Sequence, residues 1–516
     1  EKRDRKPLKM IKYILILIGL RSVASVNTTT TQLQVQIPHV LFKPGTGYGH
    51  QAANFGVYPY GASLQQPVFY SESKFCNDAD QQLTQYYPRA VDGMDQQIRD
   101  GHYHTPFILM IDRGDCAFTT KVRNAQKAGA AAVLIADDHC VCGHQECKIG
   151  DTYVCQRTLP IIVDDGSGRD ISIPSFLLYK EDSDAIKQVL LQDQNVIFSM
   201  GFKIPAPDAR VEYELWTAPT DHFIDENLWT SLRTIALALG DHASFTPQMS
   251  LYDGTQQDCT YDGNCPNMCT NNGRYCAFGL NDEKVSGADL VTESLRRICI
   301  WNRYGQEDGI GKEWFDYVYT FSSTCYKDGR LDRFTDEGCV TKAMKKSGID
   351  PETINNCMRD SGGLEANAPN TLLDQALAAQ QELGVVLIPS VWVNRVLVQG
   401  KMTFREIFSA LCSGYVEGSQ PQICHACQNC LHNPEKCIQD GGICENPSSG
   451  IAYSVFAGCL GGIVVVFVGM FVVYRTREKR HLRDQIRNIM AESTITRTND
   501  RTIDPTNDPT NDRTVV

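Results

Sequence analysis

The sequence lacks the short motifs that mark the common hydrolases. Its 516 residues contain no G-x-S-x-G, which would place a nucleophilic serine on a strand-to-helix turn, and no H-E-x-x-H, which would place two zinc ligands on one helix face. An excess of basic residues is also lacking, because the formal net charge is −12. That balance argues against nucleic acid as the main partner. The sequence therefore predicts a protein that is not an enzyme and does not bind nucleic acid.

Cysteine is absent from the C-terminal end of the chain but frequent elsewhere. Of the 21 cysteines, Cys459 lies in an uncharged apolar run, twenty precede that run and none follows it. An even number on one side predicts disulfide bonds in an oxidising compartment. The segment HCVCGHQEC, residues 139–147, imitates a zinc site, but disulfides are the favoured interpretation in this context. The residues after Tyr474 contain only one histidine, His481, so they cannot form a RING zinc site.

Two apolar segments predict the membrane topology of the chain. Residues 1–26 place basic residues before a short apolar core and small residues after it, which is the layout of a signal peptide. Residues 451–474 carry no formal charge. As a helix they would be about 36 Å long, enough for a hydrocarbon core of about 30 Å. A basic stretch follows and predicts a cytosolic tail, residues 475–516. The expected topology is that of a type I single-pass membrane protein.

The part between these segments is strongly acidic. Residues 1–26 carry +5 and residues 475–516 carry +2, which leaves −19 for residues 27–474. Such a charge is compatible with basic ligands, although solubility is the commoner reason for it. Asn27 begins the sequon Asn-Thr-Thr and is the glycosylation candidate.

Residues 27–200 alternate strand-like and helix-like segments. Apolar runs predict buried strands at 106–112, 131–137 and 171–179, and a helix is predicted at 119–128. An insertion with four cysteines, 138–170, separates the last two strands. The pattern predicts a first domain of β–α–β units.

A second unit is expected over residues 205–420. Strands are predicted at 210–217, 384–394 and 396–400, and helices at 225–239 and 402–412. A cysteine-rich, mostly helical stretch, 258–383, lies between them. Residues 421–450 hold five cysteines and read as a loop-rich stalk that needs disulfides to be stable.

Several of these segments together resemble one family. IDRGDCAFTTKVRNAQKAGAAAVLIAD, beginning at Ile111, is very similar to the core of a protease-associated (PA) domain, and specifically to that of plant-type vacuolar sorting receptors. The similarity continues in order through ISIPSFLL, RVEYELWT, CPNMCTNNGRYCA, WFDYV, SGID, LCSG and, after the apolar run, LRDQIRNIMA. It implies an α+β multidomain protein: a PA domain, a thioredoxin-like α/β domain with a cysteine-rich helical insertion, a stalk, and one transmembrane helix.

The resemblance assigns ligand binding to the loop after the strand at 106–112. The candidate ligand-binding residues are Arg113, Gly114, Asp115, Cys116 and Phe118. Glycine permits a tight turn near a ligand backbone, arginine offers a fork of donors, and the aspartate either receives a ligand amine or caps the following helix. Two other interpretations stay open at this point. The loop is either a structural turn without a ligand or, because it contains Arg-Gly-Asp, an integrin-binding signal.

The thioredoxin-like unit departs from a working thioredoxin. That fold places a cis-proline where this chain has Ile388-Pro389, and a reactive Cys-x-x-Cys at the start of its first helix. Residues 217–227 contain no cysteine, although the related receptors usually have a pair there. Cys427-x-x-Cys430 lies in the stalk, where a structural bridge is expected. The unit is therefore predicted to be a scaffold rather than an oxidoreductase.

The resemblance implies a cargo receptor. Expected partners are sorting-signal peptides of soluble hydrolases or storage proteins, held near neutral pH and released on acidification, and cytosolic coat adaptors. The expected location is the Golgi, trans-Golgi network and prevacuolar membranes. The tail lacks the Tyr-x-x-apolar signal that such receptors usually carry, so Ile486, Ile489 and Met490 are the tail sorting candidates.

One alternative to a cargo receptor remains at this stage. The missing tyrosine signal favours a cell-surface receptor or adhesion protein with a PA domain. The stalk, with CLHNPEKCIQDGGICENP, resembles at most a fragment of an epidermal-growth-factor-like repeat. No cofactor is expected. Some family members have a calcium-binding pattern in this region, so calcium is the one cofactor that the resemblance suggests.

Overall fold

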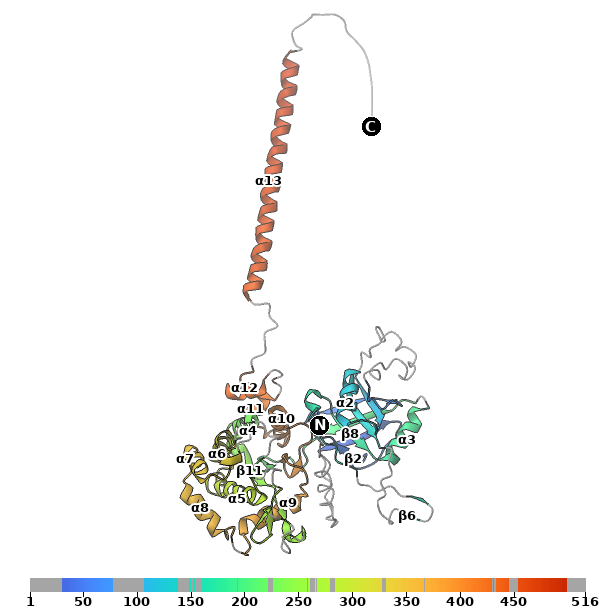
Figure 1. The fold of residues 1–516 in the computed structure, drawn as a ribbon. Coiled ribbons are helices and arrows are strands. Elements are labelled where there is room, and N and C mark those ends of the chain that lie inside the picture. The colour runs from blue at the N-terminus through green and yellow to red at the C-terminus, as the bar shows by residue number, and fades with distance from the viewer. Residues whose placement is uncertain are drawn as a thin grey trace, which may run out of the picture. The chain divides into compact units, whose positions relative to one another are not determined.

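A computed structural model shows how these segments fold (Figure 1). The structure describes residues 30–77, 106–137, 148–149, 152–153, 159–192, 194–220, 226–257, 259, 265, 267–278, 284–326, 331–365, 367–428, 430, 433–444 and 453–498. The expected signal peptide, Asn27, the segment 139–147 and the low-complexity end of the tail lie outside them. The chain divides into two compact units, Glu1–Glu445 and Asn446–Val516.

A seven-stranded mixed sheet organises the N-terminal half of the first unit. Its order is β1 (Thr31–Ile37), β9 (Ile197–Phe202), β3 (Ser63–Ser71), β4 (Phe107–Asp112), β5 (Ala130–Ala136), β8 (Ser175–Leu178) and β2 (His50–Ala52). Strands β3, β4, β5 and β8 are parallel neighbours, and the outer strands pair antiparallel. A short hairpin, β6 (Lys148–Ile149) and β7 (Thr152–Tyr153), accompanies the sheet.

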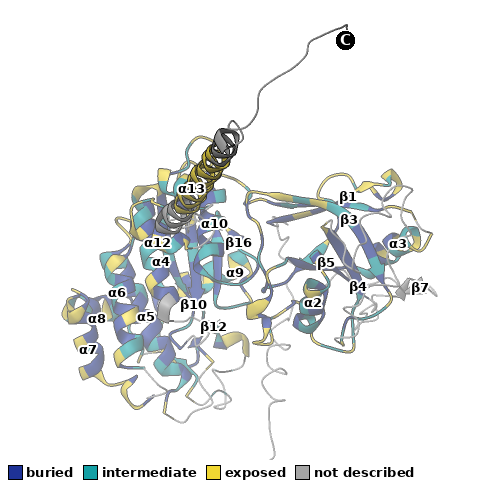
Figure 2. Cartoon of the chain, turned by 90° about the horizontal axis from the view of Figure 1, so that it is seen from above, coloured by how far each residue is buried: buried dark blue, intermediate teal, exposed yellow. Residues whose placement is uncertain are grey.

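The central strands are buried on both faces, which explains why they are apolar without alternation. Ile111 of β4 packs in one cluster with Val122 of helix α2 (Phe118–Lys127). Its neighbour Met110 points into the other cluster, which contains Ile186 of helix α3 (Lys180–Leu190). Helices therefore cover the two faces of one sheet, and the strands between them are dark in the burial view (Figure 2). The expected strand at 106–112 and helix at 119–128 form within one residue of their predicted bounds.

A second sheet forms the core of the C-terminal half of this unit. Its order is β11 (Ala243–Met249), β10 (Val211–Thr217), β15 (Ser390–Val393) and β16 (Val396–Leu397). β10 and β11 are parallel and joined by α4 (Glu226–Leu239), whereas β15 and β16 are antiparallel and lead into α10 (Phe404–Ser413). This is the order of a thioredoxin-like fold, and the Ile388–Pro389 peptide bond is cis as expected.

Helices fill the insertion between the halves of this second sheet. They are α5 (Gly287–Tyr304), α6 (Lys312–Thr324), α7 (Glu337–Lys346), α8 (Pro351–Asp360) and α9 (Thr371–Leu383). A small sheet of β12 (Tyr252–Asp253), β14 (Tyr275–Cys276) and β13 (Cys269–Thr270) precedes them. Four disulfides, Cys259–Cys265, Cys269–Cys276, Cys299–Cys357 and Cys325–Cys339, hold the insertion together. The expectation of a cysteine-rich, mostly helical stretch agrees with this.

Three expected strands are shorter in the structure. The strand expected at 396–400 covers only β16, Val396–Leu397. The other two are shortened for reasons of backbone chemistry. The segment 171–179 is extended only over β8, since Pro174 has no N–H with which to continue the ladder. The segment 384–394 forms a strand only from Ser390, because Gly384 adopts a left-handed conformation at the end of α9, and Pro389 again lacks a donor.

The segment expected to be a loop-rich stalk has helical structure. It forms α11 (Gln422–Cys427) and α12 (Pro434–Gln439), and α12 packs against α4. Cys427 and Cys430 do not bond to each other: the disulfides are Cys412–Cys424, Cys427–Cys437 and Cys430–Cys444. The segment is buried against the neighbouring domain. Its own short sequence does not indicate this contact, so the sequence predicted a loop-rich stalk.

Hydrogen bonds join the two halves of the first unit. The Tyr60 hydroxyl donates to the Gln399 carbonyl at 3.1 Å and accepts from the Gln399 N–H at 2.6 Å. The Gly400 N–H donates to the Ala53 carbonyl at 3.2 Å. Gly400 has a φ of +91°, and a Cβ there would lie 2.6 Å from Cδ2 of Tyr58, so this junction requires glycine.

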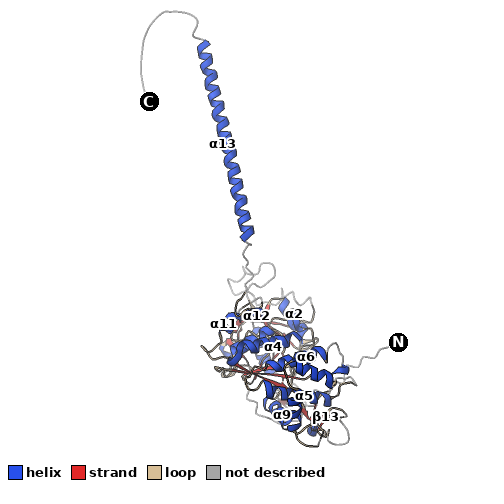
Figure 3. Cartoon of the chain, turned by 90° about the vertical axis from the view of Figure 1, so that its left-hand side faces the viewer, coloured by secondary structure: helices blue, strands red, loops and turns tan. Residues whose placement is uncertain are grey.

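The second unit contains one long helix, α13 (Tyr453–Thr498), which Figure 3 shows as an uninterrupted rod. It includes the apolar run expected to be a transmembrane helix and the first part of the expected tail. The side chains of residues 453–464, half of that apolar run, lie outside the described residues. In the part that is described, no helix has both the length and the apolar content needed to cross a membrane.

His50 provides a test of how the sheet responds to pH. Its Nδ1 donates to the Tyr48 carbonyl at 2.8 Å, so its Nε2 accepts from the Thr31 hydroxyl at 2.6 Å, and its ring packs edge-on against Phe176. Burial lowers the pKa of His50 to about 4, although the bond to Tyr48 opposes this. The unfolded chain, with an ordinary histidine pKa of about 6.5, therefore binds the proton first.

We predict that stability contributed by neutral His50 is complete above about pH 6.5 and is lost as the pH falls toward 4, by about 3 kcal/mol at most. His50→Gln should reduce the slope of the unfolding free energy against pH in that window. The matched control is His39→Gln, because His39 is exposed. Denaturant titrations at several pH values measure the slope, and an unchanged slope in His50→Gln would contradict this assignment.

Candidate functional site

The predicted ligand loop, residues 113–118, lies at the end of the parallel strands. β4 ends at Asp112, and the Arg113 N–H donates to the Ala136 carbonyl at 3.0 Å, where β5 ends. Helix α2 begins at Phe118. The loop therefore begins on the sheet and ends on a helix, so its backbone is fixed at both sides. A rigid loop of this kind is a suitable place for recognition.

The turn inside the loop depends on two left-handed residues. Gly114 has a φ of 105° and Asp115 has a φ of 68°. The Cys116 N–H donates to the Gly114 carbonyl at 2.9 Å and closes the turn. Aspartate tolerates this conformation better than most residues with a Cβ. Asp115 does not cap α2, because the capping position is Ala117, which has no side-chain cap.

Arg113 is held in place by a carboxylate that the sequence analysis did not identify. Its Nη1 lies 3.1 Å from Oδ1 of Asp137, and the guanidinium lies 6.0 Å from the centre of the Phe118 ring. The Asp137 side chain is 5% exposed and that of Arg113 is 28% exposed. Because the pair is largely removed from water, it orients the guanidinium and leaves only part of its fork for a ligand.

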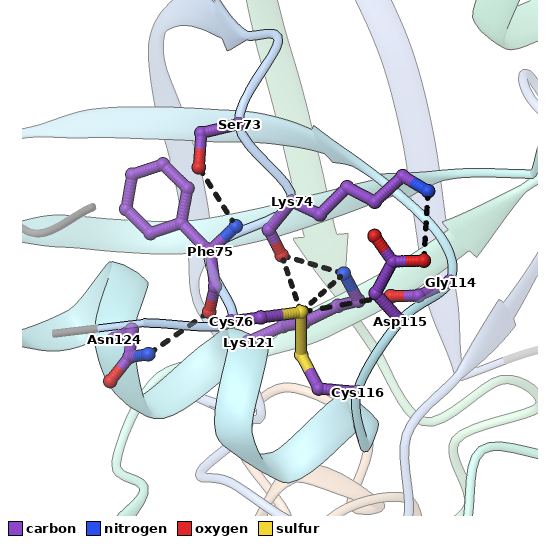
Figure 4. The surroundings of a disulfide bond; sticks show 9 residues. All are labelled: Ser73, Lys74, Phe75, Cys76, Gly114, Asp115, Cys116, Lys121 and Asn124. Atoms are coloured by element: carbon purple, nitrogen blue, oxygen red, sulfur yellow. Dashed lines mark hydrogen bonds and ion pairs between the residues drawn. A yellow bond between two sulfur atoms is a disulfide. The ribbon is translucent and has the colours of Figure 1, made fainter. Parts of the chain in front are cut away.

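A second chain segment, distant in sequence, completes the site. A disulfide joins Cys76 to Cys116, with Cα atoms 5.7 Å apart and a sequence separation of 40. Next to it, Nζ of Lys74 lies 3.1 Å from Oδ1 of Asp115 (Figure 4). The cysteine count indicated that Cys116 has a partner, but no signal in the sequence identified Cys76 or Lys74.

Helix α2 holds this second segment from below. Lys121 is fully buried, and its Nζ donates to the Lys74 carbonyl at 2.6 Å. Nδ2 of Asn124 donates to the Phe75 carbonyl at 3.0 Å (Figure 4). A buried ammonium is costly unless its hydrogen bonds are satisfied, so these contacts fix the backbone of 74–76 against α2. The lysine in the first turns of this helix thus has a structural role.

Charges around the loop are also paired. Nζ of Lys187 lies 2.5 Å from Oδ1 of Asp112, whose other oxygen accepts from the Tyr70 hydroxyl at 2.9 Å. Burial, together with that carboxylate, raises the pKa of Tyr70. The phenol therefore stays neutral and acts as a donor at all physiological pH values.

A buried polar network contacts Pro219, just before the segment where a thioredoxin carries its cysteine pair. In it, Nη2 of Arg297 on α5 donates to the Pro219 carbonyl at 3.4 Å. Nε of Arg297 donates to Glu293 at 3.0 Å, and the Tyr317 hydroxyl donates to the same carboxylate at 3.1 Å. Burial and then the charge of Glu293 raise the pKa of Tyr317 well above its ordinary value. Residues 221–225 lie outside the described part.

One group of side chains resembles a metal site by distance. The sulfur atoms of Cys259, Cys265 and Cys269 lie within 4.8 Å of one another. Each of them forms a disulfide, with Cys265 bonded to Cys259 and Cys269 bonded to Cys276. A metal ligand must be a thiolate, so these sulfurs cannot bind a metal in this state.

The tail candidates lie on α13. Ile486 and Met490 are exposed there. The side chain of Ile489 and the glycosylation candidate Asn27 lie outside the described residues. The structure thus brings together Arg113, Gly114, Asp115, Cys116 and Phe118, and adds Lys74, Cys76 and Asp137 to them.

Comparisons with known proteins find similarity in two parts of the chain. Residues 65–186 match the family model described as PA domain, and residues 211–412 match that of the vacuolar sorting receptor thioredoxin-like domain. Vacuolar-sorting receptor 1 of Pisum sativum is 30% identical over 431 residues, which are 76% of this chain and 64% of that protein. Vacuolar-sorting receptor 7 of Arabidopsis thaliana is 29% identical over 439 residues, 78% of this chain and 65% of that protein.

A third similarity is restricted to a shorter stretch. Signal peptide peptidase-like 3 of Arabidopsis thaliana is 28% identical over 134 residues, 26% of this chain and 21% of that protein. The relatives that match along most of the chain are named as receptors, and this chain spans just under two thirds of the length of each of the two receptors above.

We predict that the Cys76–Cys116 disulfide stabilises the protein more than the short-range Cys259–Cys265 disulfide does. The chain-entropy model gives about 4 kcal/mol for a separation of 40 residues and about 2 kcal/mol for one of 6. Replacing each pair by serines and measuring urea unfolding under non-reducing conditions tests this order. Equal losses of unfolding free energy would show that the 76–116 link does not constrain the unfolded chain as proposed.

Proposed function

We propose that this chain, which belongs to the vacuolar sorting receptor family, binds peptide segments of soluble proteins in the lumen of the secretory pathway and directs those proteins to a vacuole- or lysosome-like compartment. Hydrolases and storage proteins are the expected cargo. The receptor acts near neutral pH and releases cargo where the lumen is acidic. The protein is a receptor rather than an enzyme, and binding requires no cofactor.

The observation that carries this proposal is the construction of the 113–118 loop. Its backbone is fixed by the Arg113–Ala136 hydrogen bond and the Cys76–Cys116 disulfide. At the same time, the side chain of Asp115 is 66% exposed and the Arg113 guanidinium is only partly covered. Charged donors and acceptors on a fixed backbone bind a peptide at a low cost in conformational entropy.

The thioredoxin-like domain serves as a scaffold in this proposal. Residues 217–227 contain no cysteine, and in this stretch the Pro219 carbonyl accepts from Arg297, which forms a buried ion pair with Glu293. Thiol–disulfide exchange needs a thiolate. The domain therefore supports the PA domain through the junction at Tyr60 and Gln399.

The remaining parts of the proposal concern the membrane. Residues 451–474 form the membrane anchor, and the following basic part of α13 faces the cytosol. Ile486, Ile489 and Met490 then contact coat adaptors. The location is the membrane of the Golgi, trans-Golgi network and prevacuolar compartment.

We predict that Arg113→Ala reduces cargo capture about tenfold or more, because a charge-assisted hydrogen bond is lost. The full-length protein in detergent would be immobilised and exposed to a lumenal extract of its own cells, and retained proteins quantified by mass spectrometry. Arg359→Ala is the matched control, since Arg359 is an exposed arginine on α8. Arg113→Lys keeps the charge but not the fork, so it should rescue only part of the capture.

Capture that is equal in the wild type, Arg113→Ala and Arg359→Ala would contradict binding at this loop. Loss in both arginine variants would indicate a nonspecific effect of charge.

A further inference from the structure

The two ion pairs at the loop differ in how easily a ligand could replace one partner. The Arg113–Asp137 pair has a nearly buried carboxylate, at 5% exposure. In the Lys74–Asp115 pair, the lysine is 36% exposed and the aspartate 66% exposed. An exposed pair contributes little to stability, whereas breaking a buried one leaves a charge without compensation. A ligand can therefore exchange with Lys74 at low cost but cannot easily displace Asp137.

We propose that Asp115 is the recognition group for a cation on the bound peptide, and that the Lys74 ammonium occupies this position in the free protein as an internal competitor. The cation is the ammonium of a lysine or of a free N-terminus, or an arginine guanidinium. This assignment rests on the proposed peptide binding at the 113–118 loop, and it specifies the chemical class of the ligand.

Lys74 can leave Asp115 without disturbing the fold. Its backbone carbonyl accepts from Lys121 at 2.6 Å, and Cys76, two residues on, is bonded to Cys116. Neither of these contacts involves the Lys74 side chain. Its ammonium, at the end of a flexible four-carbon stem, can move into water while the backbone stays in place.

Asp115, in contrast, cannot move away. Its backbone is left-handed, with a φ of 68°, and the neighbouring Cys116 is fixed by the disulfide (Figure 4). The carboxylate can therefore move only by rotation of its short side chain, and it stays close to one place on the surface whether or not Lys74 is bound. A preorganised anion with a replaceable internal cation is suited to select a ligand cation.

The other charged groups at the loop do not favour an anionic ligand instead. Arg113 is compensated by Asp137, and Lys121 is buried with its ammonium on the Lys74 carbonyl. The most exposed charge of the loop is negative. Residues 27–474 also carry −19, which attracts cations toward the surface before contact.

Selection from a peptide library tests this inference. Full-length protein in detergent would be incubated with random heptapeptides, half of them N-acetylated, all C-terminally amidated. The retained peptides would be sequenced for the wild type, Lys74→Met, Lys74→Arg, Asp115→Asn and Arg113→Ala. Asparagine tolerates the left-handed conformation at position 115, so Asp115→Asn removes the charge without a change of backbone. Lys127→Met, at the exposed end of α2, is the control for loss of a lysine.

We expect the wild type to enrich peptides with lysine, arginine or a free N-terminus. Lys74→Met should bind a selected basic peptide about two- to fivefold more tightly, because the competitor is gone. Asp115→Asn should bind the selected basic peptide at least about tenfold more weakly than the wild type does. Its retained peptides should show no enrichment of basic residues. Lys74→Arg should behave like the wild type.

The outcomes separate this inference from the function on which it rests. Peptides retained in an Arg113-dependent way but without basic residues, or retained equally by Asp115→Asn, would overturn the cation assignment and leave peptide binding intact. Enrichment of acidic peptides would make Arg113 the recognition group and overturn it as well. If no variant retains any peptide above background, both the proposed binding and this inference are wrong.

Discussion

The disulfide between Cys76 and Cys116 is the constraint on which the rest of the candidate site depends. It joins the segment that follows β3 to the 113–118 loop that follows β4, across a sequence separation of 40. Because β3 and β4 are parallel neighbours, both segments lie at the same edge of the sheet. The buried Lys121 reinforces the link by holding the Lys74 carbonyl against α2. With the backbone of both segments fixed, the side chains of Asp115 and Lys74 are the parts of the site that are free to exchange partners.

From the sequence, the strands and the helix around this site could be predicted better than the set of residues that form it. Apolar runs in β4 and β5 and the periodic α2 predicted a loop between a strand and a helix, and the resemblance of IDRGDCAF pointed to its use. Lys74 and Asp137 could not be predicted, since neither stands in a motif and each reaches the loop only through the order of the strands. The cysteine count predicted that disulfides form, but pairing depends on distances that only the fold supplies.

The same limit explains the differences elsewhere. Val385 and Val386 belong to the apolar run that predicted a strand from residue 384, yet Val386 is exposed. The left-handed Gly384 and Pro389, which lacks an N–H donor, keep the backbone between them out of the strand. Residues 421–444 have too few apolar residues to form a core alone, but α12 packs on α4 and the Cys412–Cys424 disulfide links the segment to α10. In the thioredoxin-like domain the strand order persists although residues 217–227 contain no cysteine, and a buried Arg297–Glu293–Tyr317 network contacts Pro219 in that stretch.

The central claim is that a peptide of a lumenal protein contacts the 113–118 loop. The most direct measurement places a photo-reactive benzoylphenylalanine at Ala117, which is exposed at the start of α2, in the full-length protein and identifies its cross-links by mass spectrometry. A second protein with the same group at the exposed Val386 of the thioredoxin-like domain is the reference. The account predicts cross-links from position 117 to a segment of a soluble lumenal protein, and few from position 386. Cross-links to such proteins from position 386 alone would contradict it.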